Sequence, residues 1–515
     1  MTAAAGIGTS GTIIDTGGST DTYSNIQYFG GSSRNDSFTG NTAAETFVGY
    51  AGDDVFNGGG GIDTVDYRSE NFFAGPGSSG IIVNLSATDF TLTASNVLAG
   101  HARDATGGND TLIAIENVIG TFHDDILIGN AGNNRLDGRG GDDLSSGGQG
   151  NDVLVGGSQA QNGDTVSYFL DSTTGVKVDL AIAIAQNTVG AGIDAIMGFE
   201  NLGGSGFADT LTGDAGANHI TGAQGNDIIF GRGGADHIEG EEGDDIINGG
   251  AGADTLRGGL NTVAGDTVSY AGSLGVNVDL NIQNGTSAQV SAGDASGDIL
   301  SGFENVLGSS LADKLMGDGG DNVLMGGAGN DTLTGGLGAD TFVFNTALNA
   351  LTNKDTIVDF VSGMDHIELD NAIFTGLGLA TGTLSAVAFA LSTDIAAADD
   401  RIIYNVTTGA LIYDSNGSAA GGQTVFAVLT GHPTLTASDF QIIRSRHRRL
   451  RTESANLLCS WVTVLWSAAT CPNSRGCATD LRQRGAFLAE RFSVTVRRAP
   501  LSSAHSPSPL HRWQG

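Results

Sequence analysis

Apolar residues recur every nine positions in four stretches of this 515-residue chain. In each nine-residue unit the first residue is glycine, the sixth is usually acidic and the eighth is usually apolar. The chain holds 18 such units, of which 17 have an apolar eighth residue, with Ser145 as the exception. A flexible glycine-rich linker has no reason to keep three positions in phase, so the pattern indicates an internal structural repeat.

Each unit is predicted to form a tight turn followed by a short strand. Glycines at the first, second and fourth places allow positive φ angles without a Cβ clash. The eighth residue then points to one face of a strand that cannot bury that face alone. Stacked units bury it together, so the sequence predicts an all-β solenoid with an inward apolar row. Members of that row are Val65, Leu154, Ile229, Ile247, Leu256 and Leu333.

Three longer segments interrupt the repeat, and they share one plan. Each opens after an Asp-Thr-Val phrase that ends in tyrosine, continues through a G-x-x-V-x-L phrase (80–85, 175–180 and 275–280) and returns through Glu-Asn. Alternating apolar residues in the middle phrase, such as Val276 and Val278, are typical of a half-buried strand. We therefore expect antiparallel strands interleaved with the repeat. The inserts either extend the sheet as spacers or carry a binding surface.

Beyond the repeat the chain changes character twice. Residues 344–443 contain alternating apolar residues in 402–404 and 411–413, separated by a Thr-Thr-Gly turn, which predicts a β-hairpin in a β-rich cap over the open end of the stack. Residues 444–515 hold 12 Arg, all three Cys and all three Trp, and no repeat. This tail is either a foreign extension that does not fold or a basic segment for an anionic surface. The predicted segments are a short N-terminal piece (1–30), repeat blocks (31–66, 120–166, 204–268 and 308–343), inserts (67–119, 167–203 and 269–307), the cap (344–443) and the tail (444–515).

Several units follow the pattern G-G-x-G-x-D-x-U-x without a break, where U is a large apolar residue, for example 58–66, 147–155 and 326–334. They resemble the calcium-binding nonapeptides of RTX (repeats-in-toxin) proteins, which Gram-negative bacteria export. The resemblance implies a segmented right-handed parallel β-roll with two units per turn, so that residues 18 apart lie one above the other. It also implies Ca²⁺ ions between successive turns, held by sixth-place carboxylates and turn carbonyls. Ligand sets made of oxygen suit Ca²⁺.

The candidate Ca²⁺ ligands are the acidic residues at the sixth place. Asn134, Asn218 and Asn322 stand there in the remaining units, and sites that use them should bind the ion more weakly because a charge is lost. The implied stacking pairs Asp36 with Asp54, Glu45 with Asp63, Asp125 with Asp143, Asp209 with Asp227, Asp227 with Asp245, Asp236 with Asp254 and Asp313 with Asp331. The full candidate set is Asp36, Glu45, Asp54, Asp63, Asp125, Asp143, Asp152, Asp209, Asp227, Asp236, Asp245, Asp254, Asp313, Asp331 and Asp340.

The charge of the chain supports metal binding and excludes some partners. The net charge is −34, but residues 1–443 carry −43 (54 acidic against 11 basic residues) and the tail carries +9. An acidic body repels itself at low calcium and compacts once its carboxylates bind ions. It offers no basic, aromatic-rich patch for nucleic acid. No Cys precedes Cys459, which fits an extracellular protein stabilised by metal ions rather than by disulfides.

Residues 344–443 resemble the C-terminal β-domain of serralysin-type secreted metallopeptidases. That resemblance implies export through a type I channel that reads an uncleaved C-terminal signal. The N-terminus lacks the basic and apolar regions of a Sec signal, and no stretch is apolar enough for a membrane span. We therefore expect the type I secretion machinery as a partner, an extracellular location, and folding on Ca²⁺ outside the cell.

No catalytic signature is found in the sequence. It has no H-E-x-x-H zinc motif, no G-x-S-x-G nucleophile elbow and no phosphate-binding loop. His219 and His237 fall at the seventh place, where side chains should face solvent. We predict a calcium-binding protein that is not an enzyme. Two alternatives stay open: an adhesive or structural cell-surface protein whose inserts bind a partner or glycan, and the non-catalytic part of a larger serralysin-like metallopeptidase.

Overall fold

The computed structural model describes residues 2–5, 10–14, 20–24, 26–70, 79–92, 95–158, 161–170, 172–393, 399–417 and 421–444. These residues belong to one compact unit, Met1–Arg446. Apart from its first residue, the basic tail predicted at 444–515 lies outside the described residues, as do parts of the N-terminal piece. Among the described residues no helix is long and apolar enough to cross a membrane.

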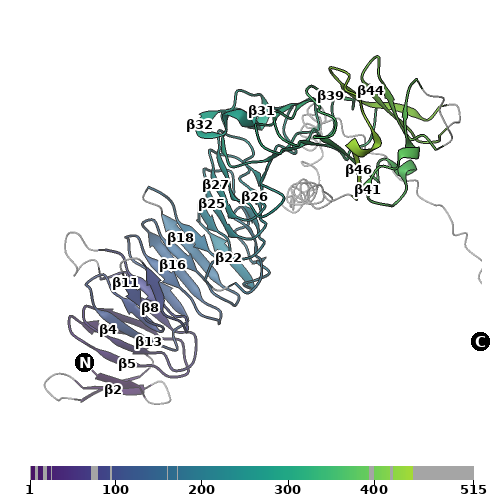
Figure 1. Ribbon diagram of the computed structural model, residues 1–515. Coiled ribbons are helices and arrows are strands. Elements are labelled where there is room, and N and C mark those ends of the chain that lie inside the picture. Colours follow the sequence, from purple (N-terminus) through teal and green to yellow (C-terminus); the bar gives the residue numbers. More distant parts are fainter. Residues whose placement is uncertain are drawn as a thin grey trace, which may run out of the picture. The chain divides into compact units, whose positions relative to one another are not determined.

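The described part of the chain is built from β-strands that run mostly parallel, with short 3-10 turns and no α-helix. The predicted all-β, parallel β-roll is therefore confirmed. Within a repeat block, β26 (Ile228–Phe230) pairs in register with β28 (Ile246–Asn248), and Ile229 lies opposite Ile247. Partners 18 residues apart are what two nine-residue units per turn require. Figure 1 shows these strands stacked side by side along the roll.

We call each uninterrupted run of parallel pairings a ladder. Ladder A comprises β1 (Thr2–Ala5), β5 (Ser37–Thr39), β7 (Val55–Asn57) and β13 (Asn109–Ile113). Ladder B comprises β4 (Tyr28–Ser32), β6 (Thr46–Tyr50), β8 (Thr64–Asp66), β14 (Asn117–Ile119), β16 (Arg135–Gly140), β18 (Val153–Ser158) and β22 (Ile193–Met197). Ladder C comprises β9 (Ile82–Asn84), β15 (Ile126–Ile128), β17 (Leu144–Ser146), β19 (Thr165–Ser167), β23 (Asn201–Gly203), β25 (His219–Gln224), β27 (His237–Glu242), β29 (Thr255–Leu260) and β33 (Ile299–Ser301).

The two remaining ladders reach the C-terminal region. Ladder D comprises β20 (Lys177–Asp179), β24 (Thr210–Thr212), β26, β28, β30 (Thr267–Ser269), β34 (Asn305–Leu307), β36 (Val323–Met325), β38 (Thr341–Phe344), β40 (His366–Asp370) and β46 (Phe440–Ile443). Ladder E comprises β31 (Asn277–Asp279), β35 (Lys314–Met316), β37 (Thr332–Thr334), β39 (Asp355–Ile357) and β45 (Gln423–Leu429).

Each insert ends one ladder and starts another. Ladders A, B and C stop at β13, β22 and β33, the last strand of each successive insert before the Glu-Asn phrase. Ladders C, D and E start at β9, β20 and β31, which carry the G-x-x-V-x-L phrases. These three strands pair parallel with the repeat strands. As the first strand of each ladder, each turns its alternate side chains into the core. The antiparallel additions in the inserts are the pair β10 (Phe90–Leu92) and β11 (Ser95–Val97), and the strands β12 (His101–Arg103), β21 (Gln186–Asn187) and β32 (Asn284–Ala288).

The core is a row of eighth-place side chains shared by the facing ladders. Val65, Leu154, Ile229, Ile247 and Leu256 are fully buried, and so is Leu333, as the repeat predicts. At the N-terminal end the row is aromatic: the rings of Phe29, Phe38, Phe47 and Phe56 stack with centroids 5.7–6.4 Å apart. Burying one such side chain contributes about 1.5–3 kcal/mol, and because each turn adds only its own pair, neighbouring turns stabilise each other.

The C-terminal region extends the stack after the sequence repeat has ended at Val343. β39 and β40 continue ladders E and D by one turn each, although no nonapeptide marks them. The predicted hairpin is present: β43 (Ile402–Asn405) pairs antiparallel with β44 (Ala410–Asp414), and Tyr404 lies opposite Leu411. β44 then pairs with β45, so this sheet covers the end of ladder E.

Candidate metal sites in the turns

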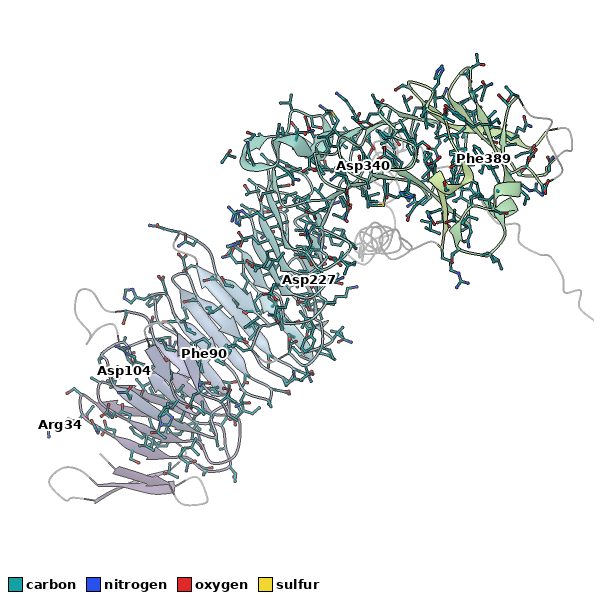
Figure 2. The ribbon with its side chains drawn as sticks, in the orientation of Figure 1. Arg34, Phe90, Asp104, Asp227, Asp340 and Phe389 are labelled. Carbon is teal, nitrogen blue, oxygen red and sulfur yellow. The ribbon has the colours of Figure 1, made fainter. Side chains whose placement is uncertain are left out.

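The sixth-place acids lie in the turn just before each strand, and their side chains are buried. Asp227 and Asp245 are fully buried, and Asp340 is 1% exposed; Asp227 and Asp340 are labelled in Figure 2. A carboxylate reaches this depth because its Oδ1 accepts the main-chain N–H of the sixth residue one turn earlier. The N–H of Asp209 donates to Asp227 Oδ1 at 2.7 Å, and that of Asp227 donates to Asp245 Oδ1 at 2.8 Å.

The structure brings together every pair that the repeat spacing predicted. In each pair the earlier residue donates its main-chain N–H to the carboxylate of the later one, over 2.7–2.9 Å. The pairs are Asp36–Asp54, Glu45–Asp63, Asp125–Asp143, Asp209–Asp227, Asp227–Asp245, Asp236–Asp254 and Asp313–Asp331. Asp152 and Asp340 accept the main-chain N–H groups of Asn134 and Asn322 in the same way, at 2.8 and 3.0 Å.

The second carboxylate oxygen, Oδ2, is buried without a hydrogen-bond donor in most inner turns. A buried carboxylate oxygen without a donor is costly and requires a partner from outside the chain, such as a proton or a cation. This group comprises Oδ2 of Asp54, Asp63, Asp143, Asp164, Asp227, Asp236, Asp245, Asp254, Asp266 and Asp331.

Burial also raises the pKa of these carboxyl groups. The pKa of Asp227 rises from 3.8 to about 8, first because burial penalises the charged form and then because Asp209 and Asp245 are close; hydrogen bonding to the Asp209 N–H opposes this. The pKa of Asp236 rises to about 7 and that of Asp245 to about 6, with burial again the largest cause. In the absence of a cation the turns therefore favour protonated or partly protonated carboxyls.

The first-place glycine leaves room for oxygens from two turns to meet. A Cβ on Gly231 would lie 2.2 Å from Asp236 Oδ2 and 2.4 Å from the carbonyl oxygen of Gly249. On Gly240 the corresponding distances would be 2.2 Å to Asp245 Oδ2 and 2.5 Å to the carbonyl oxygen of the glycine 18 residues later. A side chain is excluded there, and carboxylate and carbonyl oxygens face the same space. Converging oxygen atoms of this kind fit a hard cation such as Ca²⁺, which takes six to eight oxygen ligands.

The first turn of each block is different, because a serine or threonine hydroxyl group donates a hydrogen bond to its sixth-place carboxylate. Ser205 donates its N–H to Asp209 Oδ2 at 2.5 Å and its hydroxyl to Oδ1 at 2.7 Å. Thr121 and Ser309 do the same for Asp125 and Asp313. Asp36 accepts both groups of Ser32 through Oδ2. Both groups of a serine or threonine thus donate to each of these four candidate ligands, whereas Oδ2 of the ten acids named above has no donor.

The last acid of ladders A, B and C is instead held by a tyrosine. Tyr67 donates its hydroxyl to Asp110 Oδ2 at 3.0 Å, and Tyr270 donates to Asp298 Oδ2 at 3.0 Å. Tyr168 reaches Asp194 Oδ2 at 3.4 Å, and Thr188 donates to the same oxygen at 2.9 Å. These acids stand in the last turn of their ladder. The hydroxyl group donates to the Oδ2 atom that would otherwise contact a cation shared with a following turn.

The structure adds sixth-place acids that the nine-residue phase does not reveal. Asp110, Asp164, Asp194, Asp266, Asp298, Asp355 and Asp365 each accept the N–H of the acid one turn earlier. Glu116, Glu200 and Glu304 accept the N–H of Asp63, Asp164 and Asp266 in the same way. The sequence signal is an acid two residues before a buried apolar residue, and the intervening inserts hide its spacing.

The three asparagines follow these glutamates by one turn and need no cation. Asn218 accepts the N–H of Asp214 at 2.8 Å, and its amide donates to the carbonyl oxygen of Glu200 at 2.8 Å. Asn134 and Asn322 make the equivalent bonds to Glu116 and Glu304. The side-chain amide of the asparagine thus finds its hydrogen-bond partners within the protein, whereas Oδ2 of an inner aspartate has no donor there.

Comparison with known families identifies this repeat. A family model, the RTX calcium-binding nonapeptide repeat (4 copies), matches residues 30–65, 119–154, 203–238, 230–262 and 307–342. The chain carries RTX calcium-binding nonapeptide repeats. The matched RTX segments fall on all four predicted repeat blocks and include most of the acids with an unpaired Oδ2, whereas Asp164 and Asp266 lie outside them. No curated protein matches the chain.

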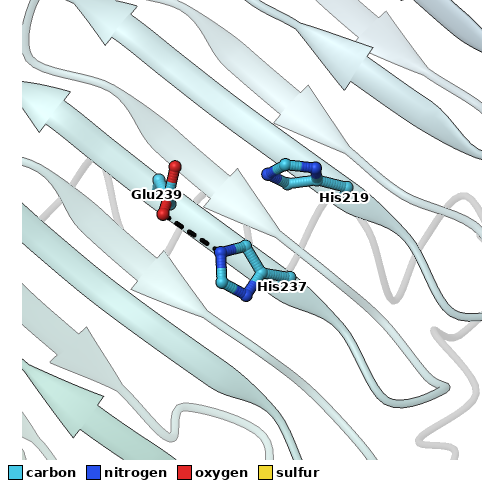
Figure 3. Close-up of side chains that lie close together, drawn as sticks. All are labelled: His219, His237 and Glu239. Carbon is cyan, nitrogen blue, oxygen red and sulfur yellow. Dashed lines mark hydrogen bonds and ion pairs between the residues drawn. The ribbon is translucent and has the colours of Figure 1, made fainter. Parts of the chain in front are cut away.

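A second cluster of side chains of metal-ligating types lies outside the RTX turns, on the strands β25 and β27. Figure 3 shows His219 and His237 side by side, with Glu239 next to His237. His237 Nε2 lies 3.0 Å from a carboxylate oxygen of Glu239, and Arg257 also pairs with that oxygen. His219 is exposed, as its seventh-place position predicts, whereas His237 at the same place of its unit is half-buried. The guanidinium group of Arg257 thus already neutralises the carboxylate of Glu239.

Proposed function

We propose that the RTX roll binds several Ca²⁺ ions and that this binding drives its folding. The observation that carries the proposal is the set of buried Oδ2 atoms without donors, most of which lie with a carbonyl oxygen over a glycine of the turn. Bound Ca²⁺ would neutralise these carboxylates and link successive turns. Asp54, Asp63, Asp143, Asp227, Asp236, Asp245, Asp254 and Asp331, with Asp164 and Asp266 from the insert boundaries, are the residues we assign to hold the ions.

The coupling of binding to folding follows from where the ligands stand. Acids from turns 18 residues apart meet only when the strands are paired. An unfolded chain therefore has no formed site, and the free energy of binding becomes free energy of folding. Sites in extracellular modules bind Ca²⁺ with dissociation constants of about 10⁻⁴–10⁻³ M, which separates a calcium-poor cytosol from the extracellular medium.

We further propose that the protein is secreted through a type I machinery and works outside the cell without catalysing a reaction. RTX repeat proteins are typically secreted, and the proposed calcium range suits the medium. We also assign the C-terminal cap, by its likeness to serralysin-type export domains, to the export-linked end of the roll. Deleting residues 344–443 should abolish appearance of the chain in the medium of a type I exporting host; unchanged export would contradict this assignment.

Counting bound ions tests the proposed function. Equilibrium dialysis of the full chain against about 1 mM Ca²⁺, within the range given above, should retain several ions per molecule. Mg²⁺ at the same concentration is the control and should be retained far less, because it demands small octahedral sites and dehydrates reluctantly. Retention of no Ca²⁺ would overturn the assignment.

A further inference from the structure

The inserts 67–119, 167–203 and 269–307 are numbered 1 to 3 in chain order. Insert 1 buries three carboxylates together beside ladder A. Glu70 is fully buried, Asp104 is 2% exposed and Asp110 is 1% exposed. Each offers one carboxylate oxygen, and these oxygens lie within 4.8 Å of one another. Asp104 is labelled in the N-terminal part of the roll in Figure 2. Asp110 is the last acid of ladder A, whereas Glu70 and Asp104 belong to no nonapeptide.

The protein supplies these carboxylates with neutral donors and leaves one oxygen without any. Asp104 Oδ1 accepts the N–H groups of Thr106 and Gly108, at 2.8 and 2.6 Å. Asp110 accepts the N–H of Asp54 at 2.9 Å and the hydroxyl of Tyr67. Glu70 Oε2 accepts the N–H of Ala105 at 3.2 Å, but Glu70 Oε1 is buried without a donor.

In the part of the chain that the structure describes, no basic side chain forms an ion pair with this cluster. None of the ion pairs found among the described residues includes Glu70, Asp104 or Asp110. Buried charges without a counter-charge carry a large desolvation cost, and buried carboxylates are normally paired or bound to a metal. Other oxygens border the cluster, since a Cβ on Gly108 would lie 2.0 Å from the carbonyl oxygen of Gly52 and 2.7 Å from Asp104 Oδ2.

We propose that Glu70, Asp104 and Asp110 form a Ca²⁺ site built by insert 1 and separate from the nonapeptide sites. The donors are all oxygen atoms, which favours Ca²⁺ over the zinc and copper ions that nitrogen and sulfur ligands select. The flexible coordination of Ca²⁺ accommodates three carboxylates and main-chain carbonyls from different segments. The site ties the insert to the turn of Asp54, because Asp54 donates its N–H to Asp110.

Insert 3 shows that this fold does not require a carboxylate at position 70. Both inserts open with a tyrosine that binds the last acid of a ladder, and Ser273 follows Tyr270 as Glu70 follows Tyr67, three residues later. Ser273 Oγ accepts the N–H of Asp294 at 2.8 Å, the bond that Glu70 makes with Ala105. A serine thus fulfils the structural task, and the carboxylate of Glu70 is an addition of insert 1.

The competing account is that Glu70 simply holds a proton. Burial, followed by the nearby Asp104 and Asp110, raises the pKa of Glu70 from 4.5 to about 10 in the metal-free protein. A neutral carboxylic acid would then remain buried at neutral pH with no ion. The two accounts differ in the number of ions that the chain retains.

The test is the number of Ca²⁺ ions that the full chain and Glu70→Ser, which places the serine of insert 3 at this position, retain in dialysis against about 1 mM Ca²⁺. We expect the variant to retain about one ion fewer and to keep its circular dichroism spectrum in calcium. Glu70→Gln, which preserves side-chain volume, should lose the same ion and covers the case in which the serine variant does not fold. Equal retention by wild type and a folded variant would overturn the site.

Failure of this site is distinguishable from failure of the RTX sites. Asp227→Asn removes a roll ligand far from insert 1 and should lower the count independently of Glu70. If the roll bound nothing, the insert site would still appear as one ion that Glu70→Ser removes. If only the insert proposal were wrong, Asp227→Asn alone would lower the count.

Discussion

The two oxygens of a sixth-place aspartate have different tasks. Oδ1 of Asp227 accepts a main-chain N–H from the turn below and thereby sets the register of the strands. Its Oδ2 stays buried without a donor. Asn218 shows the neutral alternative, since its amide is satisfied within the chain. Aspartate therefore makes the turn dependent on an outside cation, and asparagine does not.

Asp227→Asn should change stability in opposite directions with and without calcium. In metal-free protein it removes an unpaired buried carboxylate oxygen, which should stabilise the roll by about 1–3 kcal/mol. In calcium it removes a charged ligand and should weaken binding by about tenfold or more, since each 1.4 kcal/mol corresponds to about tenfold. Thermal unfolding in both conditions and calorimetric titration measure the two effects.

The matched control is Asp399→Asn, which removes the same charge from an exposed residue of the cap. It should change neither quantity. A loss of stability for Asp227→Asn in metal-free buffer would contradict the role assigned to Oδ2.

The sequence predicts the aspartates of uninterrupted units and their partners, because a fixed offset of 18 residues links them. It does not predict Glu116 or Asp110, whose ladder partners Asp63 and Asp54 lie 53 and 56 residues away across insert 1. The partners depend on long-range strand pairing, which a local repeat does not encode. The hydroxyl donors cannot be predicted for the same reason. Ser205 stands at the second place of its unit, as other residues do, and only its position in the first turn of a block makes it a donor.

At the scale of the elements, each ladder carries its chemistry in a fixed order. Ladders C, D and E start with an acid held by a serine or threonine and continue with acids that have unpaired oxygens. Ladders B, C and D pass through a glutamate and an asparagine. Ladders A, B and C end with an acid held by a tyrosine. The inserts therefore divide the roll into segments whose ends need no ion.

Tyr270→Phe should destabilise one such end. The change keeps the buried ring but removes the hydroxyl that donates to Asp298 Oδ2, leaving that oxygen without its partner. We expect a loss of about 1–3 kcal/mol of unfolding free energy in calcium, measured by chemical denaturation.

Tyr404→Phe is the matched control, because Tyr404 is equally buried but its hydroxyl has no hydrogen-bond partner. It should be neutral or slightly stabilising. Equal losses for the two variants would show that the Tyr270 hydroxyl has no special task.

At the scale of the whole molecule, an acidic chain buries many of its carboxylates. The pKa values of Asp143 and Asp227 rise to about 8, and those of Asp236 and Asp266 to about 7, with burial the largest cause. A folded-state pKa above the unfolded value means that the proton stabilises the fold. This stabilisation is complete below pH 3.8 and is lost as the pH rises through about 6 to 8.

The metal-free roll should therefore melt at a higher temperature at pH 5 than at pH 8. Calcium should reverse the order, because protons compete with the ion for the same carboxylates. Thermal melts at both pH values, in buffer stripped of metal and in calcium, measure this. A metal-free roll that is more stable at pH 8 would contradict the buried, ion-free state of these groups.

The most direct test of calcium-driven folding is a Ca²⁺ titration of the full chain, starting from metal-free protein at pH 8 and followed by circular dichroism. The account predicts incomplete β-structure at the start and a cooperative rise at about 10⁻⁴–10⁻³ M Ca²⁺. Full β-structure in the metal-free protein, unchanged by calcium, would contradict it and leave the RTX repeats as a scaffold that folds without ions.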